Sequence, residues 1–183
     1  MPRQTIRQEV WETNSSSIHT LAVKSRPCSF SEILEKVPEE LLRWIKTEGL
    51  NIGRKCNDPE FKYPSSEIEG FEDRLTETFY RTVESNSEID YQTLVFFSDL
   101  AEKLGVGLIF KANELSELDW EGWSDDCYSM AGLIRGSSER ENILASFLRF
   151  LVLPEEVIVY DSVRGEPRDI PGDFVEVLFS DDY

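Results

Sequence analysis

The sequence predicts an α+β fold in a single domain that spans residues 1–183. Two observations predict this class. Segments with strand-like alternation gather near the two ends of the chain, and segments with helical periodicity fill its middle. Grouped strands and helices are typical of α+β folds, whereas a doubly wound sheet alternates them along the chain. We therefore expect the terminal strands to form one mainly antiparallel sheet, with about four to five helices packed against it.

Two strands are predicted near the N-terminus. Residues 5–13, TIRQEVWET, alternate between apolar and polar side chains, and residues 17–23, SIHTLAV, contain a second apolar run. Between them lies ETNSSS, residues 12–17, whose Asn and Ser side chains favour turns. The simplest arrangement of these three segments is a β-hairpin.

Two helices are predicted next. Residues 30–37, FSEILEKV, follow two serines that are suitable N-caps, Ser29 and Ser31. Residues 38–49, PEELLRWIKTEG, have an apolar face and end at Gly49, a residue that commonly terminates helices.

The middle of the chain predicts a loop, two long helices and a strand. Residues 50–70 are rich in Gly, Pro, Asn and Ser, which is typical of a loop. Apolar residues recur at helical intervals over 71–85 and again over 88–105. Residues 106–112, VGLIFKA, are almost wholly apolar, so we expect a central, buried strand.

The C-terminal third predicts one more helix and two strands. Residues 137–154 have helical periodicity, with Ser137 or Ser138 as N-cap. Residues 155–162 and 174–183 have the composition of strands. These two segments and the N-terminal strands supply the predicted sheet.

Charge is the most unusual feature of the composition. Nineteen Lys and Arg stand against 36 Asp and Glu, a formal net charge of −17. Such a surface repels nucleic acid and anionic membranes and attracts basic proteins. The alternative is that the acidity serves solubility alone. The first 26 residues are the exception, since Arg3, Arg7, Lys24 and Arg26 outnumber their two glutamates.

Other sequence features predict a cytoplasmic protein. No apolar run reaches the roughly 18 residues of a membrane span, and MPRQTIRQEV lacks the apolar stretch of a secretory signal. Cys28, Cys56 and Cys127 are scattered and form no CxxC pair, which indicates free thiols in a reducing compartment. One histidine and these cysteines do not make a zinc set, and no EF-hand pattern occurs, so we expect no metal and no cofactor.

An acidic, aromatic segment is predicted to bind a partner. Residues 112–130 are expected to form a loop inserted in the domain, and residues 113–126 hold six acidic side chains and no basic one. Trp and Tyr are favoured at the centres of interfaces, and carboxylates around them steer a basic partner. Tyr128 follows the segment as a third aromatic anchor. The predicted partner-binding residues are Glu117, Asp119, Trp120, Glu121, Trp123, Asp125 and Asp126. The alternative is that the tryptophans fold back onto the core.

The turn ETNSSSIH raises the question of catalysis. On a strand Ser17 and His19 would share a face about 7 Å apart, so the spacing alone gives no Ser–His contact, and no G-x-S-x-G elbow is present. We therefore assign no catalytic residue; Ser17 and His19 are the candidates if the chain is an enzyme. A structural turn and a phosphate-binding loop remain open. The ligand-binding alternative would use Arg7, Asn14, Ser15, Ser16, Ser17 and His19, with Arg3 or Lys24 nearby.

The same stretch resembles a signature of small phage and prophage proteins. VWETNSSSIHTL, Val10–Leu21, is similar to the N-terminal F-E-T-N-S-S-S-x-H-[ST]-L pattern of that group, with Trp11 in place of the usual Phe. The resemblance implies a viral or mobile-element accessory protein, acting in the cytoplasm of the host cell. It implies no activity and assigns no role to any residue.

Together these features predict a phage-type accessory protein that binds and inhibits a host nucleic-acid-processing or defence protein. Its acidic surface would mimic nucleic acid, as in anti-restriction or anti-CRISPR proteins. The expected partner is a basic host protein such as a nucleic-acid-binding enzyme, with no direct contact to nucleic acid or membrane; a homo-oligomer stays open. The alternative is a small nucleotide-binding enzyme or sensor that uses the ETNSSSIH loop. A third possibility is a virion or regulatory component.

Overall fold

A computed structural model describes seven stretches of the chain. The predicted strand over residues 5–13, the turn that follows it and residues 112–124 lie outside them. The described residues combine six α-helices with an antiparallel sheet of strands from near the two ends of the sequence, which confirms the α+β class. The described stretches are residues 18–24, 29–53, 62–84, 91–111, 125–136, 139–161 and 172–180.

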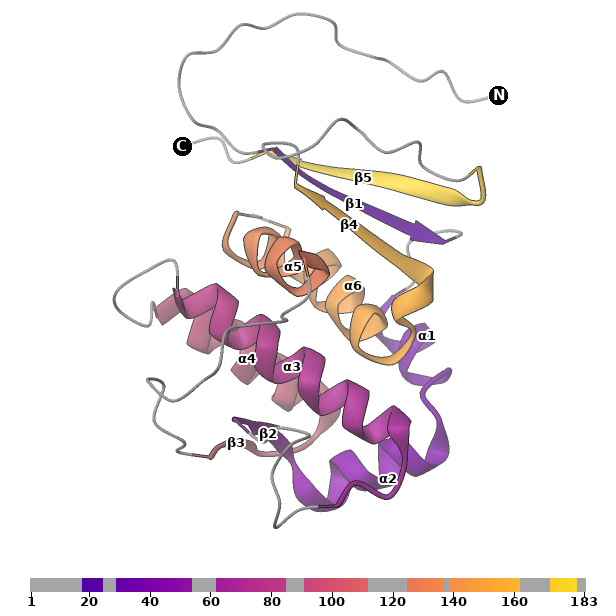
Figure 1. Cartoon of the computed structure of the whole chain (residues 1–183), viewed down its shortest axis with the longest axis vertical. Coiled ribbons are helices and arrows are strands. Elements are labelled where there is room, and N and C mark those ends of the chain that lie inside the picture. The colour runs from indigo at the N-terminus through magenta and orange to yellow at the C-terminus, as the bar shows by residue number, and fades with distance from the viewer. Residues whose placement is uncertain are drawn as a thin grey trace, which may run out of the picture.

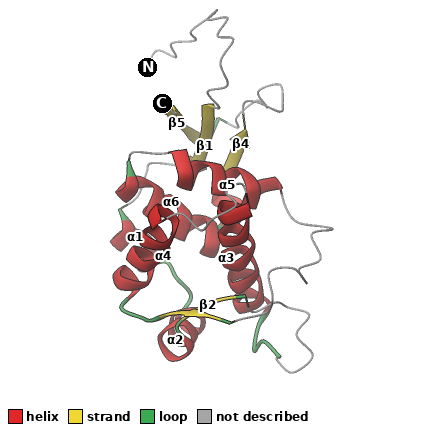
Figure 2. Cartoon of the chain, turned by 90° about the vertical axis from the view of Figure 1, so that its left-hand side faces the viewer, coloured by secondary structure: helices red, strands yellow, loops and turns green. Residues whose placement is uncertain are grey.

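Three strands from the two ends of the sequence form an antiparallel sheet at one end of the molecule (Figure 1). The central strand is β1 (Ile18–Lys24), which lies between β4 (Val157–Asp161) and β5 (Phe174–Ser180). Helices α5 (Asp125–Gly136) and α6 (Arg140–Val152) cover one face of this sheet (Figure 2). The predicted sheet of terminal strands is thus confirmed.

Two apolar residues on one face of β1 contribute to this packing. Leu21 and Val23 point into the core shared with the helices, and Val157 and Val159 of β4 join them there. Both edges of β1 are paired, one with β4 and one with β5. No edge of β1 remains for residues 5–13, so the predicted hairpin is wrong.

Capping residues define the first two helices. The hydroxyl of Ser29 accepts a hydrogen bond from Glu32 N at the start of α1 (Phe30–Leu34), and Glu32 Oε2 accepts one from Ser29 N in return. Ser29, not Ser31, is therefore the cap. Helix α2 (Glu39–Glu48) ends as predicted at Gly49, whose φ of +77° suits a residue without a Cβ.

This capping box predicts the pH behaviour of Glu32. The hydrogen bond from Ser29 N, and then that from the Ser29 hydroxyl, hold the pKa of Glu32 below its usual value. A lowered carboxyl pKa stabilises the fold above the unfolded-state pKa, and this contribution is lost as pH falls through the folded-state pKa. We expect Ser29→Ala to raise the pKa of Glu32, measured by NMR titration. Ser31→Ala is the control and leaves it unchanged; equal effects of the two variants would contradict the assignment.

A second, smaller sheet lies at the opposite end of the molecule (Figure 1). Strand β2 (Leu50–Ile52) pairs in parallel with β3 (Leu108–Phe110). The predicted loop over residues 50–70 is therefore wrong at both ends, because residues 50–52 form β2 and helix α3 (Ser66–Glu84) begins before residue 71. The strand predicted over 106–112 exists, but among the described strands it pairs with β2 alone and is not central.

Helices fill the space between the two sheets. Besides α3 they include α4 (Tyr91–Leu104), and an aromatic cluster of Phe79, Phe97 and Phe147 joins α3, α4 and α6, with ring centroids 5.1 and 5.6 Å apart. Large aromatic side chains bury much apolar area, so this cluster stabilises the centre of the domain.

Two predictions about the C-terminal helices are wrong. Residues 125–130, assigned to the acidic loop, are the first half of α5, and Cys127 and Met130 are fully buried there. Helix α6 has Glu139 at its N-cap position without a side-chain cap; Ser137 and Ser138 lie outside the described residues. The described residues contain six α-helices, more than the expected number, because α1 and α5 are both present.

Candidate interaction surface

Most of the ETNSSSIH loop lies outside the described residues. His19 is described through its backbone only: it lies in β1, in register with Asp161 of β4 and Phe179 of β5. A Ser17–His19 contact therefore stays a prediction. The other members of the predicted ligand loop fall outside the described residues, namely Arg7, Asn14, Ser15, Ser16 and Ser17.

Lys24 lies at the opposite end of β1 from Ile18 and His19. An extended strand rises about 3.3 Å per residue, so Lys24 is roughly 17 Å from His19 along β1. At that far end the Lys24 Nζ lies 3.9 Å from Asp173 Oδ2. The expectation that Lys24 helps the loop to hold a phosphate stays a prediction, because the loop lies outside the described residues.

The acidic segment is described only at its end. Asp125 and Asp126 are the first two residues of α5, and Asp126 is exposed. Tyr128 is half-buried, and the Arg81 guanidinium of α3 lies 5.8 Å from its ring centroid. The aromatic anchor that the structure describes thus packs against α3. Glu117, Asp119, Trp120, Glu121 and Trp123 lie outside the described residues, and their role stays a prediction.

Exposed carboxylates occur on several described helices, beside exposed basic residues such as Arg43 and Lys46 of α2. Some have a structural role, because acidic residues in a first helical turn interact favourably with the helix dipole. Several basic side chains, in contrast, are held in contacts: Arg140 Nε lies 2.8 Å from Asp99 Oδ2, and Lys103 Nζ lies 2.9 Å from a Glu141 oxygen. The exposed carboxylates include Glu35, Glu39, Glu40, Glu67, Glu102 and Glu155.

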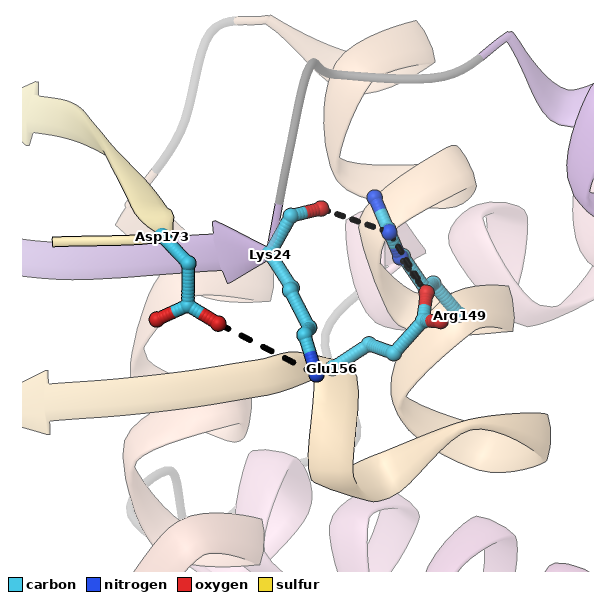
Figure 3. A network of polar contacts seen from close by, with 4 residues as sticks. All are labelled: Lys24, Arg149, Glu156 and Asp173. Atoms are coloured by element: carbon cyan, nitrogen blue, oxygen red, sulfur yellow. Dashed lines mark hydrogen bonds and ion pairs between the residues drawn. The ribbon is translucent and has the colours of Figure 1, made fainter. Parts of the chain in front are cut away.

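Two further arginines are drawn into the fold. Arg149 of α6 is only 2% exposed, and its Nε and Nη2 donate to Glu156 Oε2 at 2.8 and 2.5 Å (Figure 3). The same Nη2 donates to the backbone oxygen of Lys24 at 2.7 Å. Arg74 of α3 donates to the backbone oxygen of Leu151, and burial lowers the pKa of its guanidinium. Arg149 thus ties α6 to the end of β1, and Arg74 ties α3 to α6.

The β2–β3 sheet exposes apolar side chains at the other end of the domain. Ile109 is 40% exposed and Phe110 is 51% exposed, although the Phe110 ring also packs 5.4 Å from that of Phe79. The expectation of a buried strand at 106–112 fails here, because β3 lies at the edge of its sheet. Sequence reasoning therefore missed this surface, and an apolar run carries no signal that separates a buried strand from an edge strand.

Strand β2, which pairs with β3, is anchored by buried polar contacts. The side-chain nitrogen of Asn51 donates to the Glu48 backbone oxygen at 3.1 Å and to Glu72 Oε1 at 3.3 Å. The Gly53 N–H donates to Thr76 Oγ1 at 3.2 Å. These contacts fix β2 on α3, so the apolar surface of β3 is carried by a rigid support.

Metal and membrane sites were also considered from the geometry. Within the described stretches, no three His, Cys, Asp or Glu side chains come together as metal ligands. Nor does any described helix combine the length and apolar composition needed to cross a bilayer. Burial raises the pKa of the Tyr80 phenol beside Gly53, so this hydroxyl stays protonated at neutral pH.

Comparison with known proteins gives no further assignment. No protein-family model matches the chain, and no match was found among the curated proteins or the solved structures.

Proposed function

We propose that this protein is a phage-type accessory protein that binds a basic host protein and blocks its nucleic-acid site. The observation that carries the proposal is the formal net charge of −17. Proteins of one charge sign attract partners of the other and raise the rate of their encounter. The N-terminal resemblance to phage proteins supports the accessory role.

The described surface supports the same proposal in two ways. Arg149 and Arg74 are turned into the fold, whereas four glutamates of the first three helices are exposed, namely Glu32, Glu39, Glu40 and Glu67. In addition, the exposed Ile109 and Phe110 are followed by residues 112–126, which hold six carboxylates. In specific interfaces, exposed apolar side chains supply affinity and charge supplies steering.

Nucleic-acid-processing proteins fit the partner class because their binding sites are built to hold phosphates. Duplex DNA presents one negative charge per roughly 1.7 Å, and its partners carry matching basic surfaces. An acidic protein surface competes for those same surfaces. The proposed protein is thus a competitive, salt-sensitive inhibitor, and its action requires no catalytic step.

A competition experiment tests the function. Immobilised protein is incubated with host lysate at low salt, and bound proteins are eluted with duplex DNA. We expect DNA to release basic nucleic-acid-binding proteins, and we expect their association rate to fall about tenfold between low and physiological salt. Retained proteins that neither DNA nor salt displaces would contradict the mimicry.

Matched charge variants locate the surface. Neutralising Glu117, Asp119 and Glu121 to amides is expected to weaken capture strongly. Neutralising Glu35, Glu39 and Glu40, which removes the same charge from α2 and the residue just after α1, is the control and is expected to have a smaller effect. Equal losses would show that total charge alone, and not the acidic segment, governs binding.

A further inference from the structure

Helices α2 and α3 occupy the β2 side of the small sheet. The Gly49 N–H donates to the Ile45 oxygen at 2.9 Å, the Gly53 N–H donates to Thr76 Oγ1, and the Asn51 side chain bonds the end of α2. The residues on either side of β2 and the Asn51 side chain are therefore bound to α2 and α3. A third strand has no access on this side.

The side of β3 is open. The Leu50 N–H donates to the Gly107 oxygen at 2.9 Å, and the Lys111 N–H donates to the Ile52 oxygen at 2.8 Å. Backbone groups of alternate residues in a strand point to opposite edges, so the N–H and C=O of Leu108 and Phe110 point away from β2. In the part of the chain that the structure describes, β2 is the only strand that pairs with β3.

Such an edge is a template for strand addition. Unpaired N–H and C=O groups at a sheet edge accept an extended segment of another chain, and nearby apolar side chains give it specificity. Ile109 and Phe110 provide these side chains, at 40% and 51% exposure. Parallel sheets are normally covered, so a two-stranded parallel sheet with an exposed edge is incomplete by itself.

The acidic charge of the protein favours a basic segment as the strand that binds to the outer edge of β3. Lys111 is one basic residue, whereas the fifteen residues that follow it contain six carboxylates. A second copy of the chain would bring another net charge of −17 to the edge and would be repelled.

We infer that the outer edge of β3 binds an extended, basic segment of the partner protein, which adds to the sheet as a third strand. The inference deepens the proposed function and rests on it, since the same basic partner would supply the strand. The strand addition gives direction and register to an interaction that charge alone leaves unspecific.

The test uses peptides and one backbone variant. The probe is a library of labelled nonapeptides in which Lys or Arg alternates with Val, Ile, Thr or Tyr. Phe110→Pro removes the outward N–H and leaves the Ile109 and Lys111 N–H groups for β2. Phe110→Val is the matched control, because it loses the same ring and keeps the N–H. Circular dichroism and thermal melting verify that both variants fold.

The expected outcome is binding of library members with a Kd below about 100 µM. Phe110→Pro should weaken it about tenfold, and Phe110→Val less than about threefold. A second measurement uses the unchanged protein. N-methylation of alternate peptide residues blocks the N–H groups of one peptide edge at a time. Methylation of one edge should abolish binding, and methylation of the other edge should not. Equal binding by the two variants, equal effects of methylating either edge, or no binding by any peptide would overturn the inference.

The outcomes separate this inference from the proposed function. Capture of DNA-displaceable basic proteins that is unchanged by Phe110→Pro would overturn the strand addition and leave the acidic mimicry standing. Edge-dependent peptide binding without DNA-displaceable capture would overturn the mimicry. Self-association of the protein that Phe110→Pro abolishes would assign the edge to a second copy and overturn the basic partner.

Discussion

Replacing Arg149 with alanine is expected to lower the free energy of unfolding by about 3–5 kcal/mol. The guanidinium is 2% exposed and joins α6 to the end of β1 and to Glu156, just before β4 (Figure 3). The alanine variant loses the packing of the long side chain and leaves the Lys24 carbonyl without this donor. For a chain of this length, the melting temperature should fall on the order of 10 °C, measured together with urea unfolding.

Arg140→Ala is the matched control for this result. Arg140 is on the same helix and also makes an ion pair, with Asp99 at 2.8 Å, but both side chains are about one third exposed. Exposed ion pairs contribute about 0–1 kcal/mol, so this variant should lose little stability. If the two alanine variants lost equal stability, the buried network would not be what holds the sheet to α6.

Gly53→Ala is expected to destabilise the protein by about 2–3 kcal/mol. The residue has a φ of +98°, which side-chain-bearing residues rarely adopt, and a Cβ would lie 2.4 Å from the Lys111 backbone oxygen. Because this oxygen belongs to the backbone just after β3, the clash should push β2 and β3 apart. Urea unfolding measures the loss, and faster hydrogen exchange of the Lys111 amide reports the separation.

Gly105→Ala separates the two causes of this effect. Gly105 also has a positive φ, of +70°, but no atom lies within 4 Å of the position of its Cβ. Its substitution therefore carries backbone strain without a clash and should cost about 1 kcal/mol. Equal losses at Gly53 and Gly105 would mean that the close approach of β2 and β3 is unimportant for stability.

The sequence predicted most of the helices and strands that are determined by their own residues. The strands at residues 17–23 and 155–162 follow from local apolar patterns, and the end of α2 follows from Gly49. The pairing of the strands could not be predicted from local patterns in the same way. The hairpin was expected because neighbouring strands usually pair, but β1 pairs instead with two strands more than 130 residues away.

Tertiary contacts explain the elements that the sequence did not reveal. The start of α5, DDCYSM, has no regular apolar spacing, and its helix is held by the burial of Cys127 and Met130 in the core. The same holds for the candidate site. Ile109 and Phe110 are residue types usually found inside, so their exposure could be learned only from the position of β3 at an edge.

The central position of β1 has a consequence for how the protein is made. At about 5–20 residues per second, a ribosome needs roughly 7–27 seconds to add the more than 130 residues that separate β1 from β4. During that time the helices fold from local contacts, whereas β1 has no strand to pair with. Among the described strands, the one that is synthesised first is thus completed last, and its unpaired backbone edges and apolar side chains are exposed to chaperones or to misassembly in the interval.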